Sequence, residues 1–176
     1  AVTSTGRDIN YTIAPPIPGF PALPSSEPGE NGEFQMDCGM TKRWLEKGEP
    51  DLSSKFSCVA DLGVGGPSFE MPLYTTQLAL KERIADGTNA GFLRDDALLA
   101  IVILTDEDDC SREDNNFQIT FDEDVCADSN LEPISKYSNF LNDITGAPGR
   151  WAAAVIAGPG PGSCSSEFGD AAEAVR

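Results

Sequence analysis

Residues 97–104 read Ala-Leu-Leu-Ala-Ile-Val-Ile-Leu and end at a cluster of polar residues. A continuous apolar run of this length is typical of a strand that is buried on both faces of a parallel sheet. Residues 151–157 read Trp-Ala-Ala-Ala-Val-Ile-Ala and end at a Gly-Pro-Gly-Pro-Gly turn. The two runs therefore predict two buried strands of one sheet.

Helical patterns alternate with these strands. From Ser68, apolar residues recur along one side of a helix, with Ser68 placed to cap it and Gly87 to end it. Residues 132–144 predict a second helix and residues 167–176 the start of a third, while the β-branched residues 1–5 predict a short strand. Strands that alternate with helices predict an α/β fold with a doubly wound, mostly parallel sheet.

A proline-rich stretch interrupts this pattern. Six prolines fall between positions 15 and 28, with Gly and Ser among them. Proline lacks a backbone N–H and fixes φ, so the stretch is excluded from helices and central strands. We predict a Pro/Gly-rich surface insertion over residues 6–55 of a single domain that spans residues 1–176 and is incomplete at both ends. A ligand for an aromatic groove is the alternative, although no P-x-x-P motif with flanking basic residues is present.

Charge and composition exclude several classes of function. The chain has 29 acidic and 12 basic residues among 176, a net charge of −17. This charge disfavours nucleic acid and anionic membrane surfaces as partners, because both attract Lys and Arg. The absence of histidine excludes Ser-His-Asp triads and His-ligated zinc. The longest apolar stretch is far too short to span a bilayer, so we expect no direct membrane insertion in this segment.

The five cysteines lie at positions 38, 58, 110, 126 and 164. None belongs to a C-x-x-C pair, and wide spacing in an acidic chain indicates disulfides and an oxidising compartment. Reduced cysteines in the core are the alternative. A Cys38–Cys58 pair would close a loop of about twenty residues and stabilise the fold by roughly 3 kcal/mol. The odd number leaves either one free thiol or one partner missing.

The segment 106–128 holds ten carboxylates and one arginine. In open α/β sheets the site lies beyond the carboxyl ends of the strands, which is where the 97–104 run delivers Thr105 and Asp106. Clustered carboxylates repel one another, and a hard cation such as Mg²⁺ or Ca²⁺ relieves that repulsion. The spacing excludes an EF-hand, because the fifth position from Asp106 is Cys110. A solvated acidic loop without an ion is the alternative.

These residues carry a resemblance to a known family. Leu-Leu-Ala-Ile-Val-Ile-Leu-Thr-Asp at 98–106 resembles the fourth strand of von Willebrand factor A domains, with its terminal Thr-Asp. The longer string 91–111 resembles a branch found in large secreted or lipid-anchored bacterial proteins. Gly-Pro-Ser-Phe-Glu-Met-Pro-Leu at 66–73 resembles the start of a helix in that branch, and 151–159 resembles its fifth strand. The similarity covers most of residues 56–164.

The resemblance implies an extracytoplasmic module, secreted, periplasmic or lipid-anchored at the cell surface, that binds a protein or glycan through Mg²⁺ or Ca²⁺. It implies a chain that lacks the first strand and its Asp-x-Ser-x-Ser motif. Asp106 matches the family's ligand after the fourth strand, Ser68 and Glu70 are the nearest equivalents of its loop threonine, and Asp108 completes the predicted metal ligands.

The same resemblance implies a role for the cysteines. A Cys110–Cys126 disulfide would hold the acidic loop over the site, and a Cys38–Cys58 disulfide would hold the insertion. Cys164 would remain unpaired within this chain.

We expect no enzyme activity and predict no catalytic residue. The first alternative is a structural domain, held by disulfides, without a functional metal site. The second is a Mg²⁺-dependent phosphatase, because an apolar strand followed by Asp106-x-Asp108 also resembles the first motif of the haloacid dehalogenase family. Lys136 is the one candidate for that family's lysine, and no clear Asp pair follows a later strand.

Overall fold

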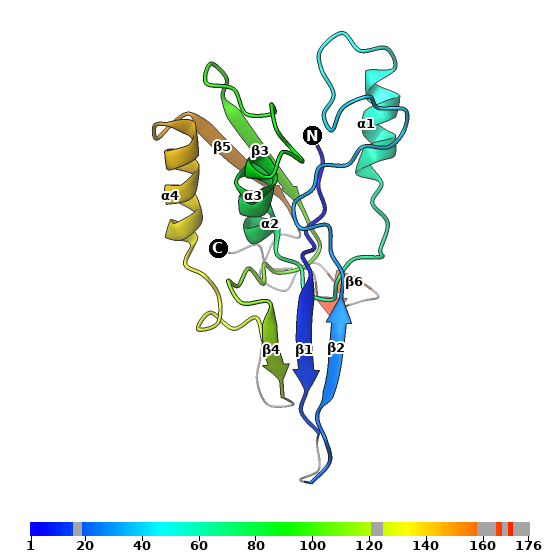
Figure 1. Ribbon diagram of the computed structural model, residues 1–176, viewed down its shortest axis with the longest axis vertical. Coiled ribbons are helices and arrows are strands. Elements are labelled where there is room, and N and C mark those ends of the chain that lie inside the picture. The colour runs from blue at the N-terminus through cyan, green and yellow to red at the C-terminus, as the bar shows by residue number, and fades with distance from the viewer. Residues whose placement is uncertain (16–18, 121–124, 158–164, 167–168, 171–176) are drawn as a thin grey trace.

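The computed structural model describes residues 1–15, 19–120, 125–157, 165–166 and 169–170 as a mixed α/β arrangement (Figure 1). The elements in chain order are β1 (Ile9–Ile13), β2 (Leu23–Glu27), α1 (Leu52–Ala60), α2 (Pro72–Leu80), α3 (Glu82–Ala85), β3 (Leu99–Leu104), β4 (Asn116–Ile119), α4 (Ile134–Thr145), β5 (Trp151–Ile156), β6 (Ser165–Ser166) and β7 (Gly169–Asp170). None of the helices in these ranges is long and apolar enough to cross a membrane.

The two apolar runs form a parallel pair of strands. β3 pairs with β5 in register from Leu99 opposite Trp151 to Leu104 opposite Ile156. Parallel strands require a crossover, and here the connection contains α4. This confirms the α/β class. The described strands nevertheless belong to three small sheets, β2-β1-β4, β3-β5 and β6-β7, and do not form the single doubly wound sheet that we expected.

The proline-rich segment contains two strands that the sequence did not predict. β1 and β2 form an antiparallel hairpin, with Thr12 opposite Pro24, and β1 also pairs in parallel with β4. The Pro/Gly-rich insertion predicted over 6–55 is therefore partly ordered, and its proline-containing strand β2 lies at the edge of the sheet, where a residue with no N–H to donate is tolerated. Residues 1–5, predicted as a strand, have no strand geometry.

Two of the three predicted helices are present with somewhat different ends, and helix α1 was not predicted. The helix predicted at 132–144 is α4, and Gly146 ends it with φ 79°. The helix predicted from Ser68 begins four residues later at Pro72, because proline is well suited to the first helical position. The helix expected at 167–176 falls mostly outside the described residues, and Gly169–Asp170 is strand β7.

The core consists of two apolar clusters. The first centres on Ile9 and Met71, both fully buried, and lies against the β2-β1-β4 sheet with Cys110, Phe117 and Val125. The second joins α2, α4 and the inner face of β3–β5, and its buried members are Phe34, Ala79, Leu80 and Leu141. Since α2 contributes to both clusters, it is the element that links them.

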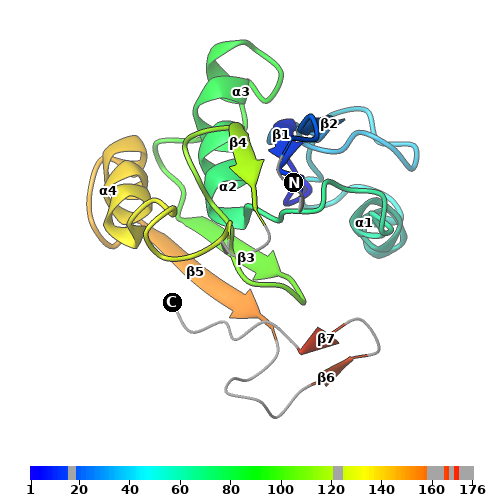
Figure 2. The same cartoon turned by 90° about the horizontal axis from the view of Figure 1, so that it is seen from below.

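The β3–β5 pair is covered on one face and open on the other. Leu99, Ile101 and Trp151 pack against the second cluster, on the side where Figure 2 places α2, α3 and α4. Their neighbours Val102, at 63% exposed, and Leu104, at 71%, point away from it. The prediction of burial on both faces was therefore wrong, because helices pack on only one side of this pair in the described structure.

Candidate functional site

The carboxyl end of β3 brings together two loops that lie 35 residues apart in the sequence. The Thr105 hydroxyl donates to a Glu70 carboxylate oxygen at 2.8 Å, and the Glu107 N–H donates to the same hydroxyl at 3.1 Å. The Cys110 N–H donates to the Glu70 carbonyl at 2.8 Å. The loop that precedes α2 is therefore fixed to the loop that follows β3 by side-chain and backbone bonds.

Three carboxylates lie near enough here to interact electrostatically, and we call Glu70, Asp106 and Glu107 the acidic end of β3. Partial burial, followed by the negative charges of Glu70 and Asp106, raises the pKa of Glu107. Such a shift means that the folded protein disfavours the third negative charge. The acidic end of β3 is thus electrostatically suited to a positively charged group.

The remaining predicted ligands do not join this set. Both the N–H and the hydroxyl of Ser68 donate to the Glu27 carboxylate, at 2.6 and 2.9 Å. Ser68 is therefore bonded to the last residue of strand β2. Asp108 is exposed in the loop beyond Glu107. Within the described ranges no three His, Cys, Asp or Glu side chains are arranged to hold a metal ion. The four predicted ligands are therefore not assembled as one set, and a metal at this position stays a prediction.

Two residues that the sequence did not single out cap α2 from a distant loop. The Leu73 N–H donates to Asp109 at 3.2 Å, and the Tyr74 N–H donates to the Ser111 hydroxyl at 2.8 Å. The residue before the helix, Met71, makes no side-chain cap. Ser68 is therefore not the cap that we predicted, because the free N–H groups of the first turn find acceptors 36 and 37 residues further along the chain.

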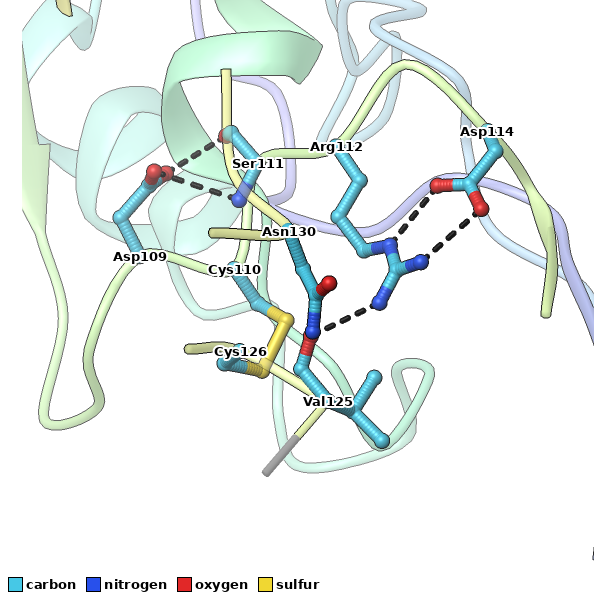
Figure 3. Close-up of a disulfide and its surroundings, with 8 residues drawn as sticks. All are labelled: Asp109, Cys110, Ser111, Arg112, Asp114, Val125, Cys126 and Asn130. Atoms are coloured by element: carbon cyan, nitrogen blue, oxygen red, sulfur yellow. Dashed lines mark hydrogen bonds and ion pairs between the residues drawn. A yellow bond between two sulfur atoms is a disulfide. The ribbon is translucent and has the colours of Figure 1, made fainter. Parts of the chain in front are cut away.

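Both predicted disulfides are present, Cys38–Cys58 and Cys110–Cys126. Figure 3 shows the second between the cap residue Asp109 and the turn at Val125. Cys110 is 1% exposed and belongs to the first apolar cluster, so this bond fixes the acidic loop to the core beneath it. Cys164 lies outside the described residues.

An arginine closes the other side of the disulfide loop. Arg112 donates to both carboxylate oxygens of Asp114, at 2.7 and 2.9 Å, and to the Val125 carbonyl at 2.7 Å (Figure 3). Its guanidinium carbon lies 4.5 Å from the centre of the Phe117 ring. The hydrogen bond from Arg112 lowers the pKa of Asp114. The single arginine of the acidic segment therefore ties two of its turns together.

Lys136 gives no support to the phosphatase alternative. Its ammonium lies 3.2 Å from Glu132 and 3.4 Å from Glu113. Burial by itself lowers the pKa of Lys136, but the bonds from these two carboxylates outweigh it and raise the pKa. Lys136, on the first turn of α4, therefore forms its ion pairs with Glu132 and Glu113 and not with Asp106 or Asp108.

Comparison with known proteins adds no further assignment: no family model matches the chain, and no curated protein or solved structure does so either.

Proposed function

We propose that this chain is an extracytoplasmic binding module of the von Willebrand factor A type, which engages a protein or glycan partner at the acidic end of β3 with a divalent cation, Mg²⁺ or Ca²⁺. The observation that carries the proposal is the Thr105–Glu70 bond. It holds a carboxylate from the loop before α2 beside the two carboxylates that follow β3, at the end of a parallel strand where α/β folds place their sites.

The electrostatics support a bound cation. Glu107 has a raised pKa because it is partly buried beside Glu70 and Asp106. A cation at this position relieves the repulsion, and its hard oxygen ligands favour Mg²⁺ or Ca²⁺. The described residues do not supply a complete ligand set, so the partner's own acidic group or further ligands would have to complete the coordination.

The disulfides support an extracytoplasmic location. Two cystines within the described residues are compatible with an oxidising compartment, where such bonds persist. The Cys110–Cys126 bond also fixes the loop that follows the acidic end of β3 to the first apolar cluster, which suits a preformed binding surface.

A metal titration tests the proposal. The thermal unfolding of the purified chain is followed with CaCl₂ or MgCl₂, against NaCl at matched ionic strength. A cation at 100 times its Kd should stabilise the fold by about 2.7 kcal/mol. Asp106→Asn should abolish this gain, whereas Ser68→Ala, whose hydroxyl is committed to Glu27, should keep it.

The opposite outcome supports a structural role. The observation that favours this second candidate is that Ser68 and Asp109 are both engaged in bonds that hold the fold, to Glu27 and to the first turn of α2. If neither salt changes the unfolding temperature beyond the NaCl control, the acidic loop is a solvated surface on a domain stabilised by disulfides.

A further inference from the structure

The sheet of β2, β1 and β4 has a second face, opposite to the first apolar cluster. Figure 1 shows the three strands side by side, below the helices. Ile9, Tyr11 and Phe117 point into the cluster, and side chains alternate along a strand, so their neighbours point the other way. The neighbours form two rows across the sheet, with Ser26, Asn10 and Asn116 in one and Pro24, Thr12 and Gln118 in the other. We call these six residues the neutral face.

The neutral face is open to solvent. All of its residues are exposed except Thr12, which is half-buried. None of its amide and hydroxyl side chains forms a hydrogen bond with another residue that the structure describes. These groups therefore bond to water, which a ligand with matching donors and acceptors is able to replace.

The neutral face is uncharged in a strongly acidic protein. The chain has a net charge of −17, yet residues 9–26 and 115–120 contain no charged side chain. Natural sheets commonly place charges, lysine above all, on exposed edge strands to prevent association. On this face neither edge strand, β2 or β4, has a charged residue. A surface without charge favours a partner without charge.

The side chains of this face suit the hydroxyl groups of a sugar. An Asn or Gln amide both donates and accepts, and Ser and Thr hydroxyls do the same. Sugar hydroxyls also donate and accept, so one amide is able to bond two neighbouring hydroxyls at once. Pro24 adds an exposed apolar ring, against which the C–H face of a pyranose packs. The three strands span about 10 Å and the two rows about 7 Å, which fits a short, flat glycan segment.

Other classes of partner fit the neutral face less well. Protein interfaces depend on aromatic residues, Met or Arg at their centre, and the neutral face has none of these. Nucleic acids and acidic polysaccharides need positive charge, which is also missing from it. An uncharged glycan needs neither feature.

We propose that the neutral face binds an uncharged, extended glycan through the amide side chains of Asn10, Asn116 and Gln118. This binding needs no metal ion, because the amide and hydroxyl groups supply both donors and acceptors. It does not depend on the proposed cation site, since the neutral face shares no residue with the acidic end of β3. Either site can therefore fail without the other.

Side-chain amide signals give a direct readout of this binding. ¹⁵N-labelled protein is titrated by NMR with cellohexaose or chitohexaose, two neutral and extended glycans, in the presence of EDTA. The NH₂ signals of Asn10, Asn116 and Gln118 should shift saturably, with a Kd in the millimolar range that a few neutral contacts support. The NH₂ signal of Asn139, which is exposed on α4, should not shift. An oligomer of galacturonate, which is anionic, should shift none of them.

Variants separate binding from folding. Asn116→Ala combined with Gln118→Ala removes two exposed amides that bond to no described residue, so the backbone amide spectrum should keep its folded pattern. Binding should weaken about 10-fold, the loss expected of two neutral hydrogen bonds. Asn139→Ala should bind as the unaltered chain does.

Three results would overturn the proposal: no saturable shift with either neutral glycan, equal binding by the double variant, or equal shifts with galacturonate. Shifts of the same NH₂ signals on dilution of the protein alone would assign the face to a second copy of this chain, and would overturn the proposal as well.

Discussion

The Asn89 side-chain amide donates to the Gly32 carbonyl at 2.9 Å, across 57 residues of sequence. The same amide donates to Ala79 at 3.0 Å and accepts from the Phe34 N–H at 3.1 Å, and Asn89 is fully buried. One side chain thus joins the loop after β2 to the end of α2. Gly32 is suited to this contact, because a Cβ there would lie 2.4 Å from the Ala79 nitrogen.

Asn89→Ala should therefore destabilise the fold by about 3 kcal/mol, because three buried backbone groups lose their partner. Urea unfolding of the variant, followed by circular dichroism, measures the change. Asn139→Ala on the exposed face of α4 is the matched control and should change stability by less than about 0.5 kcal/mol. Equal losses in the two variants would mean that Asn89 does not join the segments.

Asp109→Ala should weaken the start of α2. The substitution removes the acceptor of the Leu73 N–H and of the Ser111 hydroxyl, and loss of a helix cap costs about 1 kcal/mol. Amide hydrogen exchange of the first turn of α2 is the direct readout, because exchange there should accelerate more than in α4. Ser68→Ala, at the cap position that the sequence suggested, should leave exchange in α2 unchanged.

The two disulfides offer a matched pair with different environments. They span 16 and 20 residues, so loop closure alone gives each a similar contribution of about 3 kcal/mol. Cys110 is buried in the core, whereas Cys58 is exposed. Replacing Cys110 and Cys126 by alanine should therefore cost more in guanidinium unfolding than replacing Cys38 and Cys58. The reverse order would show that burial of the sulfur adds nothing.

The two faces of β3 predict opposite responses to truncation. Ile101→Ala removes packing against the second cluster and should cost about 2 kcal/mol. Val102→Ala affects a side chain that is 63% exposed, and the expected loss is below about 1 kcal/mol. Chemical unfolding of both variants measures the difference. A larger loss for Val102 would mean that the outer face is covered.

The acidic end of β3 makes stability dependent on pH. Burial and the neighbouring charges of Glu70 and Asp106 raise the pKa of Glu107, so the folded state favours its protonated form. Stability from this group is present below its ordinary pKa of 4.5 and is lost as the pH rises through the raised value. Glu107→Gln should therefore unfold at a higher temperature than the unaltered chain at neutral pH and at the same temperature near pH 3.

The matched control for that comparison is Asp143→Asn, which removes the same charge at an exposed position on α4. Thermal unfolding between acid and neutral pH should give this variant the profile of the unaltered chain. An identical gain in both variants would assign the effect to net charge rather than to the site.

The sequence predicted the elements whose signals are local. The apolar runs at 97–104 and 151–157 are β3 and β5, and the periodic segment at 132–144 is α4. Length, apolarity and a Gly stop are enough to predict such elements. How many faces a strand buries depends on what else packs against it, so the open side of β3 could not be read from the run itself.

The polar contacts at the candidate site were less predictable. Ser68 has the residue type of a helix cap, yet it bonds to Glu27, because the β1–β2 hairpin brings that carboxylate within reach. Asp109 appeared only as one charge among ten, and its role as a cap depends on the return of the chain beside α2. Pairings that arise from chain topology leave no local signature, whereas the wide spacing of the cysteines already indicated disulfides.

The capping of α2 from residues 109 and 111 has a consequence for the order in which the protein is made. Leu73 leaves the ribosome 36 residues before its acceptor. At a translation rate of about 5–20 residues per second, the first turn of the helix waits roughly 2 to 7 s for the side chain that completes it. For most of that interval the nascent α2 lacks the β3 strand, and for all of it the helix lacks its cap, so its first turn is completed only when the loop beyond β3 has been synthesised.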